Sequence, residues 1–188
     1  TMKTTIMKSF VLTLAIALSG MYVQAQEKGD VSAGLRLNLG TSPAAGLSSQ
    51  FGVGLDFNWS ITDAIRLSPE FNFFFPKKVA EALGAELKWN TWDFSINGQY
   101  LFKLGDVVLY PQFGLTIQGA SVKWEGADEW EEYGGGAAKS SETKFGINFG
   151  AGVEYRLSEA ISLDFRAKYN VVSNWSRAVV GVGAAYHF

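Results

Sequence analysis

The sequence has no cysteine and almost no histidine, two side chains on which many metal and catalytic sites are built. It contains no cysteine, which excludes disulfides, thiolate metal sites and cysteine nucleophiles together. Its one histidine, His187, cannot make a histidine metal cluster, and we expect no cofactor and no metal site. A net charge of −2 without any basic stripe argues against nucleic acid as a partner.

The sequence also has no apolar run long enough for a spanning helix, which needs roughly 20 residues. The longest run, Phe10 to Val23, follows the basic residues Lys3 and Lys8 and precedes small residues. This order is typical of a secretory signal peptide. We therefore expect residues 1–25 to be a signal peptide cleaved before Gln26. An uncleaved N-terminal membrane anchor is the alternative.

The chain does contain stretches in which apolar residues alternate with small or polar ones. In the stretch FGVGLDFNWS, from Phe51 to Ser60, every odd position is apolar and every even position is small or polar. A period of two indicates a β-strand with two different faces. The same pattern predicts eight strands, at Val31–Leu39, Gln50–Ser60, Ile65–Phe75, Trp89–Phe102, Val107–Trp124, Thr143–Leu157, Ile161–Val171 and Arg177–Phe188.

The connections between these strands alternate in length. Tight turns are expected at Ile61–Ala64, Lys103–Asp106 and Ser158–Ala160, and mostly long connections at Gly40–Ser49, Pro76–Lys88, Glu125–Glu142 and Val172–Ser176. Long loops at one end and short turns at the other are typical of an up-and-down barrel in an outer membrane. Pro69 and Pro111 lie inside strands, where each removes a ladder hydrogen bond, and we expect both at β-bulges.

Side-chain volume decides which face of the strands points inward. An eight-stranded barrel has an interior just wide enough to be filled by side chains. The bulky apolar face would overfill that interior, whereas the opposite face combines glycines with polar residues. We therefore expect the apolar face, including Leu55, to contact lipid and the polar face to line the lumen. A serine in place of Gly54, on the polar face, is expected to be tolerated.

The inward face carries six basic and five acidic residues, close to neutral. Because an unpaired confined charge is strongly destabilising, these residues are predicted to form a lumen ion-pair network. Its members are Arg36, Asp56, Arg66, Glu70, Asp93, Lys144, Glu154, Arg156, Asp164, Arg166 and Lys168.

Tryptophans near the strand ends predict an aromatic girdle at the membrane interfaces. They are Trp59, Trp89, Trp92, Trp124 and Trp175.

With these features the chain resembles the small eight-stranded outer-membrane β-barrel family, of the OmpA and OmpX transmembrane type. The resemblance covers Gln26 to Phe188, and its most specific mark is the ending VVGVGAAYHF. It implies an all-β, eight-stranded, antiparallel, up-and-down transmembrane barrel over residues 26–188. In this family the last strand is a sorting signal read by the β-barrel assembly machinery. The matching residues here are Val180, Val182, Ala184, Tyr186 and Phe188.

The functional expectation is a non-catalytic protein of the outer membrane with a plugged polar lumen and a structural or surface-interaction role. His187 is expected at the rim of the lumen, far from the outer leaflet where a lipid-modifying enzyme would act. Expected partners are outer-membrane lipid and lipopolysaccharide, and the barrel is expected to be a monomer. The alternatives are a narrow porin, a barrel that transports a small ligand, and a secreted lipocalin-like binder.

One surface segment has a marked charge, the stretch EGADEWEEYGGG from Glu125 to Gly136. It suggests adhesion or cation bridging, but it lacks the ordered spacing of a calcium loop, and a solvated loop is the simpler interpretation. Its acidic residues are Glu125, Asp128, Glu129, Glu131 and Glu132.

Overall fold

A computed structural model describes residues 28–41, 49–82, 85–125 and 140–188, with side chains described except at 78–87 and 123–125. No helix in these ranges is long and apolar enough to cross a membrane. The strands are β1 (Val31–Gly40), β2 (Gln50–Ser60), β3 (Ile65–Ala82), β4 (Ala85–Tyr100), β5 (Phe102–Leu104), β6 (Val107–Glu125), β7 (Ser140–Arg156), β8 (Ile161–Val172) and β9 (Arg177–His187).

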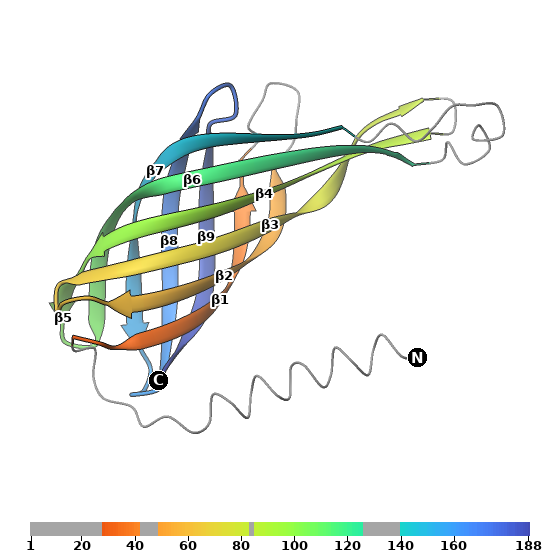
Figure 1. Ribbon diagram of the computed structural model, residues 1–188. Coiled ribbons are helices and arrows are strands. Elements are labelled where there is room, and N and C mark those ends of the chain that lie inside the picture. The colour runs from red at the N-terminus through yellow and green to blue at the C-terminus, as the bar shows by residue number, and fades with distance from the viewer. Residues whose placement is uncertain (1–27, 42–48, 83–84, 126–139) are drawn as a thin grey trace.

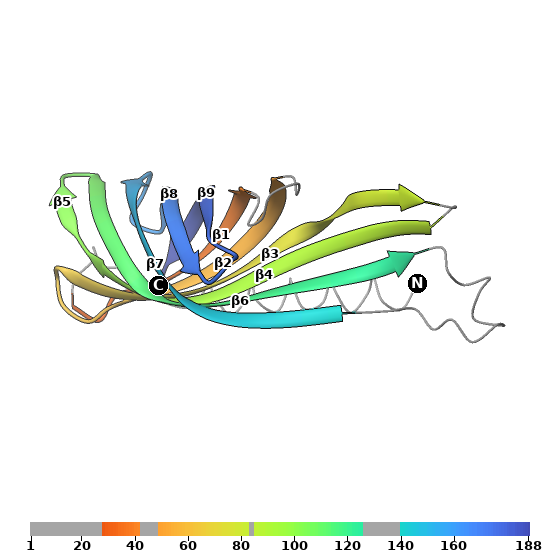
Figure 2. The ribbon, with the colours of Figure 1, turned by 90° about the horizontal axis from the view of Figure 1, so that it is seen from above.

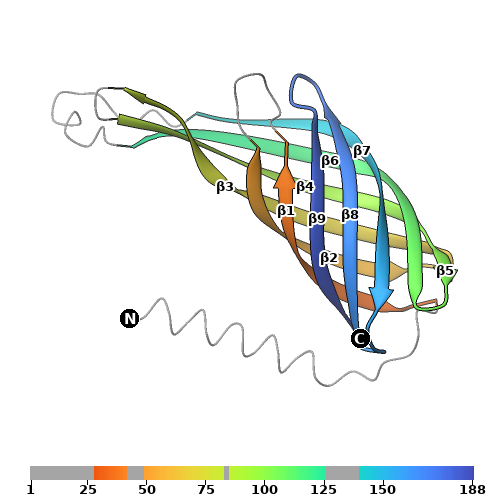
Figure 3. The same cartoon turned by 180° about the vertical axis from the view of Figure 1, so that it is seen from behind.

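The strands form one antiparallel sheet that closes on itself (Figures 1 and 3). Neighbours in the chain are neighbours in the sheet, β1 pairs with β9, and β4 pairs with β6. The short β5 continues β4 along the same partner, so the wall contains eight strands. The predicted eight-stranded antiparallel barrel is confirmed.

Each in-strand proline keeps an unshifted register with one neighbouring strand and interrupts the pairing with the other, so the expected bulges are wrong. The register of β3 with β4 runs unshifted through Pro69, and that of β6 with β7 runs unshifted through Pro111. A bulge needs an extra residue, and neither strand has one here. On its other side β6 faces β4 and β5. Pro111 has no N–H to donate to them, and the strand is interrupted there between β4 and β5. Leu101, at the interruption, donates its N–H to the Ala64 carbonyl at 2.8 Å.

The register sets a steep strand tilt. Following paired residues from Arg36 around the wall reaches Gln118 on β6 in one direction and Val108 on β6 in the other. These positions are ten residues apart along β6, which is the shear of the barrel. Because of this stagger, inward side chains that meet across the lumen are far apart in sequence.

The inner face is polar and the outer face is apolar, as predicted. Burial along β2 alternates at every residue. Leu55 is 57% exposed, whereas its neighbour Asp56 is 6% exposed. This arrangement excludes the lipocalin-like alternative, in which an apolar cavity would face inward.

Four adjacent strands, β3, β4, β6 and β7, continue beyond the wall as a curved extension (Figures 1 and 2). Pairing of β2 with β3 stops at Phe74, and pairing of β7 with β8 starts only at Gly146. The predicted loop over 76–88 is therefore wrong, because most of it is strand. The other strand bounds agree with the prediction to within three residues. One register shift in the β3–β4 pair spans Pro76, where β3 leaves the wall, and a second lies just beyond it, between Lys78 and Ala80.

Candidate functional site

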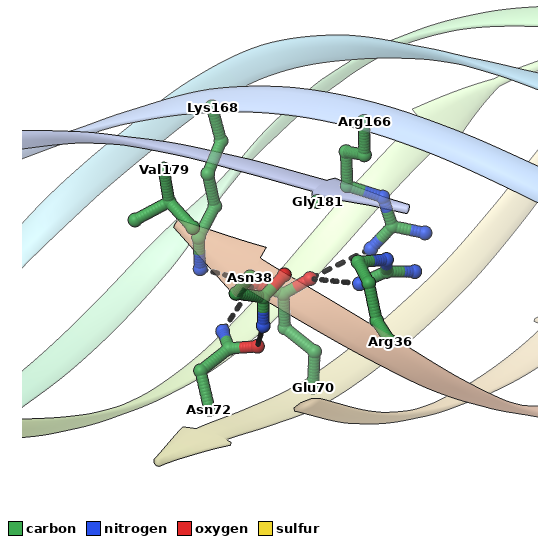
Figure 4. Close-up of a pocket in the computed structure, with 8 residues that line it drawn as sticks. All are labelled: Arg36, Asn38, Glu70, Asn72, Arg166, Lys168, Val179 and Gly181. Atoms are coloured by element: carbon green, nitrogen blue, oxygen red, sulfur yellow. Dashed lines mark hydrogen bonds and ion pairs between the residues drawn. The ribbon is translucent and has the colours of Figure 1, made fainter. Parts of the chain in front are cut away.

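The centre of the lumen is organised around Glu70 of β3 (Figure 4). Its carboxylate accepts a hydrogen bond from Arg166 Nη1 of β8 at 2.6 Å and another from Lys168 Nζ, also of β8. Arg36 Nη1 of β1 lies 3.7 Å from the same carboxylate. Each of the four side chains is at most 5% exposed. The contacts connect three strands across the interior.

Two further carboxylates complete the central charge balance. Arg36 Nη2 lies 2.7 Å from Asp56 Oδ1 and 2.9 Å from Asp164 Oδ1. The Tyr110 hydroxyl donates to Asp164 and accepts a bond from Arg166 Nε at 2.9 Å. A side chain at position 152 would collide with the Tyr110 ring, so Gly152 leaves the space that this tyrosine fills.

The short-turn end of the lumen is closed by a second cluster. Arg66 Nη1 lies 2.6 Å from Glu154 Oε2, and Arg66 Nε donates to Gln99 Oε1 at 2.6 Å. His187 Nε2 is 2.8 Å from Ser162 Oγ and 3.4 Å from Glu154 Oε1. His187 is the last residue of β9 and lies at this end of the lumen, where the sequence predicts a rim histidine, and its side chain is 3% exposed because it packs into this cluster.

The long-loop end is closed by the predicted lumen residue Asp93 together with residues that were not predicted to face the lumen. The Arg177 guanidinium donates to Asp93 and to Thr91, each at 2.7 Å, and lies 3.8 Å from the centre of the Phe74 ring. Beside Thr91, Gln50 donates to the Trp89 carbonyl at 3.2 Å. Arg177 has the same parity as the inward positions of β9, which was the available signal for placing it inside.

Little space remains between these clusters. Two cavities of about 10 Å³ each lie in the lumen, one beside Glu70 and Lys168 and the other between Arg66 and Asp164. A cavity of that size holds about one water molecule. The described side chains therefore fill the centre of the barrel.

The structure brings together nine of the eleven residues predicted for the network. They are Arg36, Asp56, Arg66, Glu70, Asp93, Glu154, Asp164, Arg166 and Lys168.

The remaining two predicted members, Lys144 and Arg156, lie at the ends of β7 and stand apart from the network. Lys144 lies in the part of β7 that extends beyond the wall. Its Nζ is 3.4 Å from Glu142 Oε1 and 4.3 Å from the centre of the Trp175 ring. Arg156 is the last residue of β7, and its Nη2 is buried without a hydrogen-bond partner among the described residues. Both have the inward parity but lie too far along the strand to reach the central acids.

The predicted girdle needs one correction. Trp89 is 4% exposed on the inner face, because it has the same parity as Asp93. Trp59 is 48% exposed on the outer face, and Trp92 is half-buried against Phe71 with ring centres 6.2 Å apart. Trp175 is half-buried in the β8–β9 turn under Lys144. The Trp124 side chain lies outside the described part of the chain.

The outward residues of the last strand lie on one face. Val180 is 41% and Val182 is 55% exposed, with Ala184 and Tyr186 following at alternate positions. The Tyr186 and Phe188 rings meet edge to face with centres 5.4 Å apart, and Phe188 donates its N–H to the Val31 carbonyl at 2.9 Å.

The predicted acidic surface loop falls almost entirely outside the described residues. The backbone of Glu125 ends β6, and its side chain is not described.

Comparison with known proteins agrees with this architecture. Residues 10–188 match the family model described as outer membrane protein beta-barrel domain. No curated protein matches the chain.

Solved structures show the same fold at low sequence identity. OprG from Pseudomonas aeruginosa has a TM-score of 0.61 and 15% identity, with 89% of this chain and 99% of that chain covered. The attachment invasion locus protein Ail of Yersinia pestis has a TM-score of 0.57 and 15% identity, covering 86% of this chain and 99% of that one. Neisserial surface protein A has a TM-score of 0.54 and 21% identity, with 85% of this chain and 96% of that chain covered.

Proposed function

The chain belongs to the outer membrane protein beta-barrel domain family, and from that premise we propose that it is a non-catalytic, closed barrel with a structural and surface-interaction role. Short turns of such barrels face the periplasm and long loops face the outside. The proposal includes export through a signal peptide over 1–25, assembly by the β-barrel assembly machinery, and a monomeric barrel in contact with membrane lipid and lipopolysaccharide.

The ion-pair network around Glu70 is the main observation that supports a closed lumen. Arg36, Arg166 and Lys168 reach this carboxylate from β1 and β8, so the contacts cross the path that an ion would follow. Opening the path would separate buried pairs, and breaking one such pair costs about 3–5 kcal/mol. The cavities beside the network have room for about one water molecule each, which supports a plug and not a channel.

The polar groups of the lumen also support the absence of catalysis. Glu154 and Asp164, which are register partners on β7 and β8, are paired with Arg66 and Arg36 respectively. His187 is buried between Ser162 and Glu154 at the periplasmic end, and both of these contacts are made by the same ring nitrogen. A catalytic relay would need the acid on the other nitrogen. We therefore assign this cluster a structural role.

The extension of β3, β4, β6 and β7 supports a role at the cell surface. Its strands carry the chain beyond the wall on the side of the long connections (Figure 1). The acidic residues between β6 and β7, Asp128, Glu129, Glu131 and Glu132, follow directly after this extension in the sequence. We propose that this connection is the part of the protein that meets external partners.

Single-channel recording in planar bilayers tests the closed lumen. The purified protein should insert, as judged by its heat-dependent gel migration, and give no steady conductance. A wide porin in the same bilayer serves as the positive control. A reproducible, steadily open conductance would overturn the plug and support the alternative of a narrow porin.

A further inference from the structure

A continuous row of inward positions winds once around the lumen and carries only uncharged residues between its two ends. We call it the polar spiral. It starts at His187, the last residue of β9, whose register partner is Ser32 of β1, and Ser32 is paired with Asn58 of β2. The register between β2 and β3 is the same on both sides of the interruption at Pro69, which places Ser68 of β3 opposite Asn58.

The polar spiral continues around the other half of the barrel. The serine on β3 is paired with Asn97 of β4, and Asn97 is paired with Gly114 of β6. The next members are Asn148 of β7 and Asn170 of β8, and Asn170 is paired with Arg177. Arg177 is the first residue of β9, so one turn of the spiral climbs the length of this strand from the short-turn end to the long-loop end.

Most members of the polar spiral have buried polar atoms without a hydrogen-bond partner among the described residues. These atoms are Asn58 Oδ1, Ser68 Oγ, Arg177 Nε and both amide atoms of Asn97, Asn148 and Asn170. Every side chain of the spiral is at most 4% exposed. An unpaired buried polar group is costly, so these atoms require a partner that the neighbouring side chains do not supply.

The asparagines of the spiral cannot satisfy one another. Side chains in register on neighbouring strands have Cβ atoms about 5 Å apart. Each amide offers two N–H groups and an oxygen with two lone pairs, so even a direct bond between Asn148 and Asn170 would leave most of these sites unfilled. Asn97 leans over Gly114 towards β7, and a Cβ on that glycine would lie 2.4 Å from Asn97 Oδ1. The three amides therefore follow one another along the wall.

The chemistry of the unpaired atoms defines the ligand. Between His187 and Arg177 the row carries no charge, and its unpaired atoms include both N–H donors and oxygen acceptors. A small, neutral molecule that both donates and accepts fits this set, and buried water typically bonds to about three such groups. A cavity of about 10 Å³, which holds about one water molecule, adjoins Asn58 near the start of the spiral.

We propose that the polar spiral binds a file of internal water molecules, from the cavity beside Asn58 past Asn148 and Asn170 to Arg177. The file follows the wall of the lumen and leaves the ion pairs around Glu70 in place. The inference goes beyond the closed lumen, because it assigns water to a path that lies beside the plug. Its test is also independent, since a barrel can hold such water whether or not it conducts ions.

Water-selective NMR of the folded, full barrel in lipid nanodiscs, with isotope-labelled asparagine, tests the site. We expect rotating-frame Overhauser peaks between water and the side-chain amide protons of Asn97, Asn148 and Asn170. Asn148→Leu replaces one amide by an apolar group of similar shape and should abolish the water peak of Asn170. Ile147→Val, on the outer face of β7, is the matched control and should leave all three peaks unchanged.

Asn72 is the control within the unmodified protein. It is 1% exposed, but its Nδ2 donates to Glu70 and Asp93, and it should show no water peak. The proposal is overturned if the three asparagines of the spiral are as free of water peaks as Asn72. It is equally overturned if a coupling across a direct hydrogen bond joins Asn148 to Asn170 in place of water. Heat-dependent gel migration shows whether each variant has folded, and the peaks of the unmodified protein decide the matter if a variant has not.

Discussion

The guanidinium of Arg166 on β8 lies 2.6 Å from the carboxylate of Glu70 on β3, a contact between residues 96 positions apart. Both side chains are at most 3% exposed. The pair is therefore held in a confined polar interior, where its partners cannot be replaced by bulk water.

Replacing Arg166 by leucine should destabilise the barrel by about 3–5 kcal/mol, because it leaves buried carboxylates with too few cations. Arg156→Leu is the matched control, since Arg156 stands apart from the network, and its cost should stay below about 1 kcal/mol. Urea unfolding in lipid vesicles measures both. Equal midpoints for the two variants would show that the central charges are not confined.

Leu55→Arg should destabilise the folded barrel by roughly 2–4 kcal/mol in lipid, because the side chain faces the acyl chains. The same substitution in a water-exposed position would cost little. The measurement is again the unfolding free energy in vesicles. A cost near zero would mean that the outer face of β2 is not in lipid.

On the inner face of the same strand, Gly54→Ser is expected to cost about 1–3 kcal/mol. A Cβ at this position would lie 2.7 Å from Asn38 Nδ2, which is bonded to Asn72 Oδ1 at 2.7 Å. The tolerance expected from the sequence considered only the polarity of the lumen and not how closely it is packed. Unfolding of Gly54→Ser in vesicles decides between the two views.

Trp89→Ala should cost about 3–5 kcal/mol, because it empties a buried position at the long-loop end of the lumen. Trp59→Ala, on the outer face, is the control and should cost about 1 kcal/mol. A larger loss for Trp59 than for Trp89 in the same unfolding assay would contradict the inward placement of Trp89.

Deleting Phe188 should lower the fraction of chains assembled in the outer membrane and increase their degradation before insertion. Phe57→Ala removes an outward aromatic ring from the middle of a strand and serves as the control. The measurement is the heat-modifiable band in the outer-membrane fraction. If the deletion and the control assemble as well as the unchanged chain, Phe188 is not part of a sorting signal.

Much of the wall could be predicted because alternation follows directly from the pleat of a strand. The alternation of odd and even positions along β2 predicts Leu55 on the outer face of the barrel and Asp56 in the lumen. Trp89 was misplaced because its position near a strand end was weighed above its parity. The extension beyond Phe75 was missed because backbone pairing there does not require the apolar alternation by which strands were recognised.

The partners inside the lumen could not be predicted from the sequence. Which base meets which acid depends on the ten-residue stagger of the wall, which brings Arg66 of β3 to Glu154 of β7. Parity also says nothing about depth, and for this reason Lys144 and Arg156 were assigned to a network that neither reaches. The partners and the membership of the network both depend on how far along the barrel axis each inward residue lies, and strand parity does not give that position.

The most direct test of the closed membrane barrel is paramagnetic line broadening in the NMR spectrum of the unmodified protein in lipid nanodiscs. We expect a nitroxide in the acyl chains to broaden the Leu55 methyl signals, and an aqueous gadolinium chelate to leave them unchanged. The side-chain amide of Asn72, 1% exposed in the lumen, should be broadened by neither agent. Broadening of Asn72 by the chelate would show an open lumen, and Leu55 methyls untouched by the acyl-chain nitroxide would contradict the membrane placement itself.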